Sequence, residues 1–248
     1  MIFSENRVPL FRIMLLRQRN VHSTVVSFAS PQPLTKDSAD GLAVADFNGD
    51  GKPDLITADF SSSTLSVLLG NGDGTFHPGP QIPLGTQPTA LLLGQFNPLD
   101  DHFLDLAVVS PNSDQVAIFL GNGDGTFQLV QTLAAQRLAV GQFHGTADNV
   151  PDLAVASSQA DAVRILLNDG HALFQDAGSI PVGTGDKRLV RADLNGDGQD
   201  DLVAVNTTSS VASLLRGNGD GTFTPMGSLP VPGHVDFVAA GEIGRAHV

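Results

Sequence analysis

The feature that most constrains this chain is a peptide that recurs at a regular distance. Forms of Leu-Leu-Gly-Asn-Gly-Asp-Gly-Thr-Phe end at Phe76, Phe127 and Phe223, and a degraded form ends at Phe174. In chain order these phenylalanines are spaced 51, 47 and 49 residues apart. A fixed period of this length is typical of a repeat protein, in which each unit packs on its neighbours.

A second, acidic peptide repeats with the same spacing. It runs from Asp46 to Asp54 as Asp-Phe-Asn-Gly-Asp-Gly-Lys-Pro-Asp, and a near copy runs from Asp193 to Asp201. The last Asp of four related loops falls at positions 54, 105, 152 and 201, again 51, 47 and 49 residues apart. Because two independent landmarks share one spacing, the chain contains four copies of one unit.

Each unit is predicted to hold four short β-strands. In the first unit these are Leu42–Phe47, Leu55–Ala58, Leu65–Leu69 and a fourth strand that begins at Thr75. The Asn-Gly-Asp-Gly sequence before the fourth strand predicts a tight turn, and the Phe after it a core anchor between blades. Four strands in roughly 50 residues is the pattern of a β-propeller blade, and the alternative is a β-helix with a long coil.

The acidic loops are predicted to bind Ca²⁺. Oxygen-bearing side chains at alternate positions around an Asp-Gly turn suit a hard cation, and Mg²⁺ is less suited because it prefers to keep its waters. Carboxylates packed together would also repel one another without a cation. The alternative is an Asx-rich surface turn that holds no ion. The predicted ligands are Asp46, Asn48, Asp50, Lys52 and Asp54 in the first loop and Asp193, Asn195, Asp197, Gln199 and Asp201 in the fourth, with Lys52 and Gln199 acting through backbone carbonyls.

The second and third loops depart from this pattern. Each carries two extra residues, and Gln95 or Gln142 replaces the first Asp. With one carboxylate fewer we expect weaker binding, and His144 is a poor ligand for Ca²⁺. The alternative is a loop held by hydrogen bonds alone. The weaker candidate ligands are Gln95, Asn97, Asp101 and Asp105 in the second loop and Asp148 and Asp152 in the third.

The paired sequences DFNGDGKPDL and LLGNGDGTF resemble the FG-GAP/VCBS repeat family of β-propellers, which is related to the integrin α-chain head. The resemblance covers residues 28 to about 243. It implies an all-β propeller of four-stranded antiparallel blades that binds Ca²⁺ between the first two strands of a blade. It also implies an extracellular or cell-surface location.

The arrangement of the units predicts a fragment of a longer propeller. The complete units are expected at 41–89, 90–138, 139–187 and 188–236. Phe28 falls where the last strand of a preceding blade is expected, and residues 237–243 resemble the start of a fifth unit. Residues 1–27 form a flank without predicted structure. Residues 244–248 match the translation of a sequencing adapter, so they are expected not to be natural protein, and the alternative is a short natural tail.

Composition and missing motifs exclude several function classes. A net charge of −13 argues against nucleic acid as a partner, because phosphate binding needs a basic surface. No apolar stretch is long enough to span a membrane. Neither the Gly-x-Ser-x-Gly motif nor a phosphate-binding Gly-x-x-x-x-Gly-Lys is present, so no catalytic residue is predicted and the chain is not expected to be an enzyme.

The sequence therefore predicts a Ca²⁺-binding extracellular propeller that acts as a non-catalytic binding or adhesion scaffold for a protein or glycan. A lectin is one alternative, although the chain has no Trp or Tyr on which a sugar ring could stack. An accessory module of a larger secreted enzyme that acts on polysaccharides is another.

Overall fold

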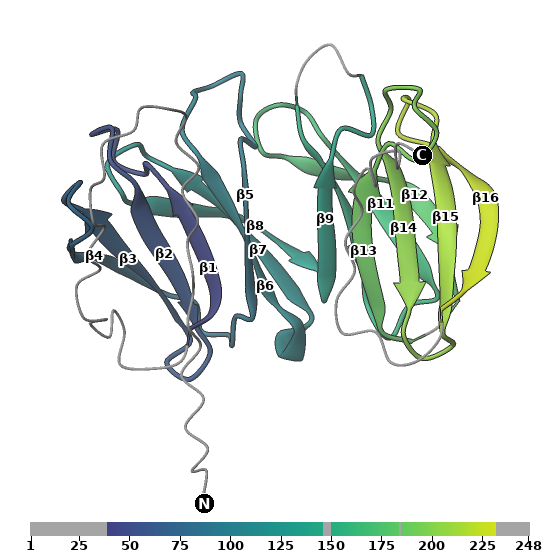
Figure 1. Ribbon diagram of the computed structural model, residues 1–248, viewed down its shortest axis with the longest axis horizontal. Helices are drawn as coiled ribbons and strands as arrows, with labels where there is room; N and C mark the ends of the chain where they lie inside the picture. Colours follow the sequence, from purple (N-terminus) through teal and green to yellow (C-terminus); the bar gives the residue numbers. More distant parts are fainter. Residues whose placement is uncertain (1–38, 146–149, 184, 232–248) are drawn as a thin grey trace, which may run out of the picture. The chain divides into compact units, whose positions relative to one another are not determined.

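A computed structural model describes residues 39–145, 150–183 and 185–231, which belong to one compact unit. In these ranges the chain forms four sheets, each made of four antiparallel strands that follow one another in the sequence (Figure 1). We call these sheets blades 1 to 4. The N-terminal flank 1–27, Phe28, the predicted start of a fifth unit at 237–243 and the tail 244–248 lie outside the described residues.

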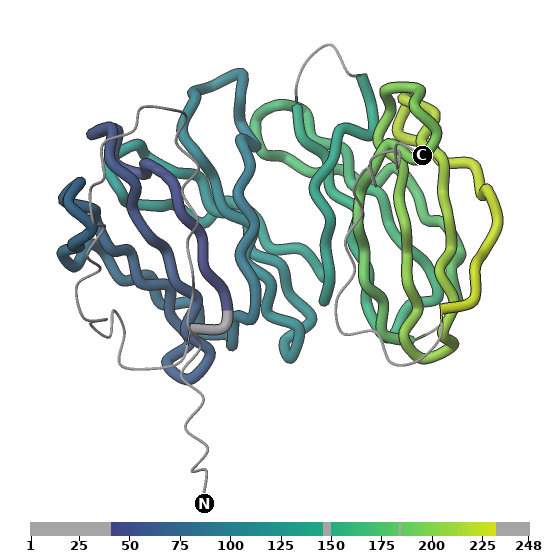
Figure 2. The backbone as a smooth tube through the Cα atoms, in the orientation of Figure 1, coloured from purple at the N-terminus to yellow at the C-terminus, as the bar shows by residue number. Residues whose placement is uncertain are grey.

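The backbone passes through the four blades in chain order (Figure 2), and corresponding strands of the blades have similar lengths. Blade 1 contains β1 (Ala39–Ala45), β2 (Asp54–Asp59), β3 (Thr64–Gly70) and β4 (Phe76–Pro83). Blade 2 contains β5 (Ala90–Gly94), β6 (Asp105–Ser110), β7 (Gln115–Gly121) and β8 (Phe127–Ala134). Blade 3 contains β9 (Arg137–Gly141), β10 (Asp152–Ala156), β11 (Ala162–Asn168) and β12 (Phe174–Pro181). Blade 4 contains β13 (Lys187–Ala192), β14 (Asp201–Asn206), β15 (Val211–Gly217) and β16 (Phe223–Pro230).

The second strand of a blade is buried on both of its faces. In β6, Leu106 and Val108 belong to an apolar cluster shared with blade 1, whereas Ala107 and Val109 belong to a cluster shared with blade 3. This division follows from the alternation of side chains along a strand. It explains why the sequence of the strand is apolar throughout and does not alternate with polar residues.

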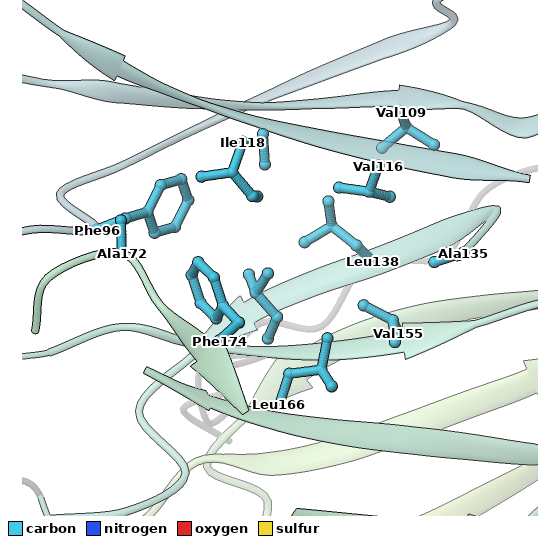
Figure 3. Packing of buried hydrophobic residues seen from close by; sticks show 12 residues of the cluster. Phe96, Val109, Val116, Ile118, Ala135, Leu138, Val155, Leu166, Ala172 and Phe174 are labelled. Carbon is cyan, nitrogen blue, oxygen red and sulfur yellow. The ribbon is translucent and has the colours of Figure 1, made fainter. Parts of the chain in front are cut away.

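Three apolar clusters join the blades in chain order. One lies between blades 1 and 2, the next between blades 2 and 3, and the third between blades 3 and 4. Figure 3 shows the middle cluster, where the rings of Phe96 and Phe174 lie together beside Ala172. The first strands also meet, since β1 contacts β5 and β9 contacts β13.

The all-β propeller fold that the repeat predicts is confirmed. In blade 1 the second and third predicted strands fall within β2 and β3, and the fourth strand begins one residue after Thr75. Phe47 was predicted to end the first strand, but β1 stops at Ala45 and Phe47 lies in the acidic loop. Across the described residues the regular helical structure is one 3₁₀ turn, Pro111–Ser113, and no helix there has the length and apolar character needed to cross a membrane.

Candidate functional site

Each acidic loop connects the first and second strands of its blade. Loop 1 (46–54) joins β1 to β2, and loop 2 (95–105), loop 3 (142–152) and loop 4 (193–201) join the equivalent strands of blades 2 to 4. The last Asp of each loop is the first residue of the second strand. Because the four blades share one strand order, the four candidate sites lie at equivalent positions in the blades.

Loop 1 folds around the carboxylate of Asp46. Its Oδ1 accepts the N–H groups of Gly49 (2.8 Å) and Asp50 (3.2 Å), and its Oδ2 accepts the N–H of Gly51 (2.8 Å). The N–H of Asp50 also donates to Oδ1 of Asn48 at 3.0 Å. Side-chain oxygens of Asp46 and Asn48 thus both accept a hydrogen bond from the backbone nitrogen of Asp50. Two of the five predicted ligands of this loop therefore place side-chain oxygens at the backbone N–H of a third.

Loop 4 has the same arrangement. Oδ1 of Asp193 accepts the N–H groups of Gly196 (2.7 Å) and Asp197 (3.2 Å), and Oδ2 accepts that of Gly198 (3.0 Å). The N–H of Asp197 donates to Oδ1 of Asn195 at 2.9 Å. Two loops far apart in the chain therefore adopt one local structure, which is a consequence of their shared Asp-x-Asn-Gly-Asp-Gly sequence.

The structure places Lys52 and Gln199 beside the second carboxylate of each loop. The N–H of Lys52 donates to Oδ1 of Asp50 at 2.9 Å, and its Nζ lies 3.1 Å from Oδ2. The N–H of Gln199 donates to Oδ1 of Asp197 at 2.8 Å. The hydrogen bond from the N–H of Lys52 is the main cause that lowers the pKa of Asp50.

The first carboxylate of loop 4 is also held in its ionised form. The backbone N–H of Gly198 is the main cause that lowers the pKa of Asp193. Ionised oxygen ligands are the form that a hard cation binds.

The last Asp of each loop lies inside the blade. Asp54 has no exposed surface; its Oδ2 accepts the N–H of Phe47 (2.9 Å) and its Oδ1 that of Gly70 (2.7 Å). Asp201 is equally buried and accepts the N–H groups of Leu194 and Gly217, both at 2.8 Å. These carboxylates join the start of the acidic loop to the end of the third strand, a role that sequence reasoning did not assign to them.

Loop 2 contains one buried polar atom without a partner. Asn97 is 2% exposed, and its Oδ1 accepts no hydrogen bond, while its Nδ2 donates to Oδ2 of Asp101 at 2.9 Å. Gln95 donates through Nε2 to the backbone carbonyl of Asp101 (3.4 Å). Burial raises the pKa of Asp105 to about 6. Of the four weaker candidates in this loop, Gln95 and Asn97 therefore both contact Asp101.

Loop 3 differs from the others, and its residues 146–149, which include Asp148, lie outside the described residues. Oδ2 of Asp152 accepts the N–H groups of Phe143 (2.8 Å) and His144 (3.0 Å) and lies 2.8 Å from Nδ1 of His144. Its Oδ1 accepts the N–H of Asn168 at 3.0 Å. Protein donors therefore occupy both oxygens of Asp152.

The candidate ligands of the four loops meet the requirements of Ca²⁺ to different extents. In the part of the chain that the structure describes, no three Asp, Glu or His side chains converge to form a group suited to a metal. The donors of loops 1 and 4 are instead mixed, with two exposed carboxylates and one amide oxygen in each. A carboxylate has about four acceptor sites, so the N–H bonds leave capacity for a cation. Loops 1 and 4 fit Ca²⁺, loop 2 fits in part, and the described residues of loop 3 do not.

Loops 1, 2 and 3 are also held by the blade that follows them. The N–H of Gly125 donates to the carbonyl of Phe47 (2.9 Å), and that of Gly221 donates to the carbonyl of Phe143 (2.8 Å). The ring of Phe47 packs edge to face on Phe127, with centroids 5.8 Å apart. The prediction that the Phe after the turn is a core anchor between blades is confirmed for Phe127, Phe174 and Phe223.

A cavity that sequence reasoning missed lies between β9 and loop 4. Its volume is about 340 Å³, and its polar lining includes Gln142, Arg191 and Asp200. Asp200 accepts the N–H of Gln142 (2.8 Å) and a bond from Nη1 of Arg191 (3.0 Å). No motif marks these residues in the sequence; they come together because blades 3 and 4 are adjacent.

Comparison with known proteins gives a family and a set of structural neighbours. The model of the FG-GAP-like repeat matches residues 46–97, 146–204 and 193–245, which together make up more than half of the chain. No match to a curated protein was found.

Among solved structures, the chain is similar to BBS1N in complex with ARL6, with 15% identity and a TM-score of 0.59 over 82% of this chain and 60% of that one. An Agrocybe aegerita lectin specific for non-reducing terminal N-acetylglucosamine has 20% identity and a TM-score of 0.52 over 76% of this chain and 51% of its own. A candidate 6-phosphogluconolactonase from Bacteroides uniformis has 19% identity and a TM-score of 0.52 over 77% and 54%. The chain thus spans between half and two thirds of these neighbours, which share its fold.

Both the family match and the loop geometry fall on the same repeats. The first matched segment begins at Asp46, the residue around which loop 1 folds, and the last begins at Asp193, its counterpart in loop 4. The chain belongs to the FG-GAP-like repeat family of β-propellers.

Proposed function

We propose that this propeller is a Ca²⁺-binding extracellular scaffold that binds a protein or glycan partner without catalysing a reaction. The observation that carries the proposal is the shared structure of loops 1 and 4. In each loop the first Asp and the Asn two residues later both accept a hydrogen bond from the backbone N–H of the next Asp, which is Asp50 or Asp197. In loop 1 the cation would be held by Asp46, Asn48 and Asp50 with the carbonyl of Lys52. Asp54 would position the loop from beneath through its bonds to Phe47 and Gly70.

Bound Ca²⁺ would stabilise more than the loop itself. Loop 1 contacts the Asn-Gly-Asp-Gly turn of blade 2, because the N–H of Gly125 donates to the carbonyl of Phe47. Neutralising the carboxylates of Asp46 and Asp50 would therefore also help to hold blades 1 and 2 together. Ca²⁺ sites of extracellular modules have Kd values of roughly 10⁻⁴–10⁻³ M, which favours a location outside the cell.

The test is the melting temperature of the protein in a chelator and in about 10 mM CaCl₂. At that concentration, roughly 10–100 times Kd, each occupied site would add about 1.4–2.7 kcal/mol to the free energy of unfolding. Asp50→Ala and Asp197→Ala should each remove part of this gain, and the double variant most of it. Asp73→Ala, in a turn that is not a predicted metal site, is the matched control and should keep the full gain. Identical melting curves of the wild type with and without Ca²⁺ would rule the proposal out.

The extracellular location has a separate test. The full open reading frame, expressed in its own host with a C-terminal epitope tag, should be recovered outside the cell or be accessible to protease on intact cells. Recovery in the cytosolic fraction alone would contradict this part of the proposal and leave the calcium test unaffected.

A glycan is a second candidate partner, and the cavity between β9 and loop 4 favours it. Arg191 and Asp200 can offer a donor and an acceptor to neighbouring hydroxyl groups, and the volume of about 340 Å³ suits one sugar residue. The lectin among the structural neighbours binds such a ligand. Retention on a glycan array that Arg191→Ala abolishes would support this candidate, and the absence of any retention would remove it.

The non-catalytic role is tested directly because one structural neighbour is a candidate lactonase. Purified protein should not accelerate hydrolysis of 6-phosphogluconolactone above the buffer rate. Turnover that follows the protein through purification would overturn this part of the proposal.

A further inference from the structure

Every blade ends in an outer strand with one unpaired edge. β4, β8, β12 and β16 are each the last strand of their sheet. An open edge exposes backbone N–H and C=O groups that can pair with another strand, and proteins commonly block it with Pro, Gly or charge. The four outer strands occupy the same place in the repeat, so they can be compared position by position.

One of the four described outer strands lacks these protective residues. β4 contains Pro78, Pro80 and Pro83, and β16 contains Pro225 and Pro230. β12 contains one Pro together with an Asp and a Gly. β8 has the sequence FQLVQTLA, with no Pro, Gly or charged residue. Two of its large apolar side chains are exposed, Leu129 at 53% and Val130 at 37%. β8 is therefore the outer strand that is open to pairing.

The pairing register shows which backbone groups of β8 face outward. Leu129 pairs with Phe119 as Pro78 pairs with Leu68, and Ala134 pairs with Gln115 as Pro83 pairs with Thr64. Pro has no N–H, so at these two positions the N–H of the outer strand does not bond to the third strand of the blade. The corresponding N–H groups of β8 must point away from β7.

A third outward group lies between them. Val130 is an extra, bulged residue in the pairing of β8 with β7, so the N–H of Thr132 points in the same direction as those of Leu129 and Ala134. In the described part of the chain, no hydrogen bond outside the pairing with β7 uses the backbone of these three residues. β8 thus presents three free N–H groups, where β4 and β16 each present one at the equivalent positions.

The strand is held in place from its other side. Oε1 of Gln131 accepts the N–H of Phe174 (3.1 Å), and its Nε2 donates to the carbonyl of Phe174 (3.3 Å). Leu133 packs against the cluster between blades 2 and 3. A partner would therefore meet an edge that is already ordered, which reduces the entropy cost of binding.

A cavity with an unpartnered carboxylate oxygen adjoins the C-terminal end of β8. It has a volume of about 290 Å³ and is lined by Ala134, Asp114 and Arg164 among others. Oδ1 of Asp114 is buried and accepts no hydrogen bond. Arg164 is engaged elsewhere, by an ion pair with Asp176 (2.8 Å). The cavity therefore offers a carboxylate to a cation from outside.

We propose that the outer edge of β8 and this cavity bind an extended segment of a partner protein. The segment would add an antiparallel fifth strand to blade 2, with uncharged side chains along the edge. Antiparallel addition brings its N-terminal end to Ala134, where a Lys or Arg side chain would enter the cavity and pair with Asp114. A second copy of this chain is the less favoured occupant, because each copy carries a net charge of −13. The proposal shares with the scaffold role only the need for a partner and is independent of the Ca²⁺ sites.

The test uses a synthetic peptide in the presence of a chelator. The peptide is acetylated, begins with Lys, continues with six alternating Val and Thr residues and carries a fluorophore at its C-terminus. Fluorescence anisotropy should show saturable binding to the wild-type chain. A peptide with N-methyl groups at every second residue, which removes alternate N–H donors, and one with Glu in place of Lys should each bind at least tenfold more weakly.

Protein variants locate the site. Leu129→Pro with Ala134→Pro copies the prolines of β4 and β16, so the blade should fold normally, and it should weaken binding at least tenfold. Asp114→Asn should weaken binding severalfold. Leu229→Ala removes an equally exposed side chain (55%) from β16 and should leave binding unchanged. The reverse exchange, Pro78→Leu with Pro83→Ala, should create a second, weaker site on β4.

Three results would overturn the proposal. The first is the absence of saturable binding to the wild type, and the second is binding insensitive to both the prolines and the N-methyl groups. The third is a dimer in sedimentation equilibrium that Leu129→Pro with Ala134→Pro abolishes, because the occupant would then be a second copy. If the double variant fails to fold, the N-methylated peptide and Asp114→Asn still decide the question. None of these results depends on whether Ca²⁺ raises the melting temperature.

Discussion

The backbone N–H of Ala172 donates a hydrogen bond to the carbonyl oxygen of Phe96 at 2.9 Å, and so joins blade 3 to the acidic loop of blade 2. Gly125 and Gly221 make the same bond at the other two interfaces. Ala172 has a φ of +60°, a region that Gly enters without a steric penalty. The contact between blades therefore depends on backbone conformation at one position of the turn.

Gly125→Ala should lower the free energy of unfolding by about 1–2 kcal/mol, because Gly125 has a φ of +84° and an L-residue is strained there. The added Cβ would also lie 3.2 Å from Cδ2 of Leu69. Denaturant unfolding monitored by circular dichroism measures this loss.

Ala172→Gly is the matched control at the same position of blade 3. Relief of the strain at Ala172 is offset by the lost burial of a methyl group, about 0.8 kcal/mol, and by the entropy of Gly, roughly 0.5–1 kcal/mol. Ala172→Gly should therefore change the free energy of unfolding little, whereas Gly125→Ala should lower it. Equal unfolding curves for Gly125→Ala and the wild type would show that conformation at this position is not limiting.

The two kinds of Asp in loop 4 should respond differently to substitution in a chelator. Asp201→Ala leaves the buried N–H of Gly217 and the half-buried N–H of Leu194 without an acceptor, which should cost about 2–5 kcal/mol. Asp193→Ala removes bonds that water can replace, so its effect in the chelator should be much smaller. Added Ca²⁺ should then raise the free energy of unfolding of Asp193→Ala less than that of the wild type, because the variant has lost one site. Similar losses for the two variants in the chelator would contradict this division of roles.

His171 and Asp100 should give the packing of blades 2 and 3 a dependence on pH. Nδ1 of His171 lies 2.9 Å from Asp100 across the interface, and the hydrogen bond to Asp100 is the main cause that raises the pKa of His171. Because the pKa is raised on folding, the stabilisation is complete below the unfolded pKa of about 6.5 and is lost as pH rises through the folded value.

His171→Gln, studied in a chelator, should therefore lower the melting temperature at about pH 5.5 and match the wild type near pH 8.5. Asp100→Asn should remove the same dependence. Titration of the ring protons of His171 by NMR reports its pKa directly. A melting difference that does not change with pH would exclude the ion pair as its cause.

Lys187 is a buried cation that joins blades 3 and 4. Its Nζ donates to the carbonyl oxygens of Ala160 (2.6 Å), Gly185 (2.9 Å) and Ser157 (3.3 Å), and its side chain is buried. Lys187→Met keeps the length of the side chain but removes all three donors, so the free energy of unfolding should fall by about 1–3 kcal/mol.

Arg164→Met is the control for loss of a basic residue. Its ion pair with Asp176 is exposed, so the change should be less than about 1 kcal/mol. Chemical denaturation of both variants in one buffer makes the comparison. If Arg164→Met is the more destabilising of the two, Lys187 has been assigned the wrong role.

Much of the fold could be predicted from the sequence because its signals are local. The short apolar strand segments, the turn sequence before Phe76 and the two repeated peptides are each defined by residues close together in the chain. The gathering of Asp46, Asn48 and Asp50 could be predicted for the same reason, since all three lie within five residues. The sequence by itself therefore determined the blade, the propeller class and the positions of the acidic loops.

Only the tertiary structure showed what each residue of a loop contacts. Asp54 and Asp50 look alike in the sequence, yet Asp54 faces the interior and binds Gly70, sixteen positions away. The bond between Gly125 and Phe47 and the cavity beside Ala134 depend on which blades are neighbours. Such contacts join residues far apart in the chain, so their formation follows from the packing of whole sheets, which no local pattern encodes.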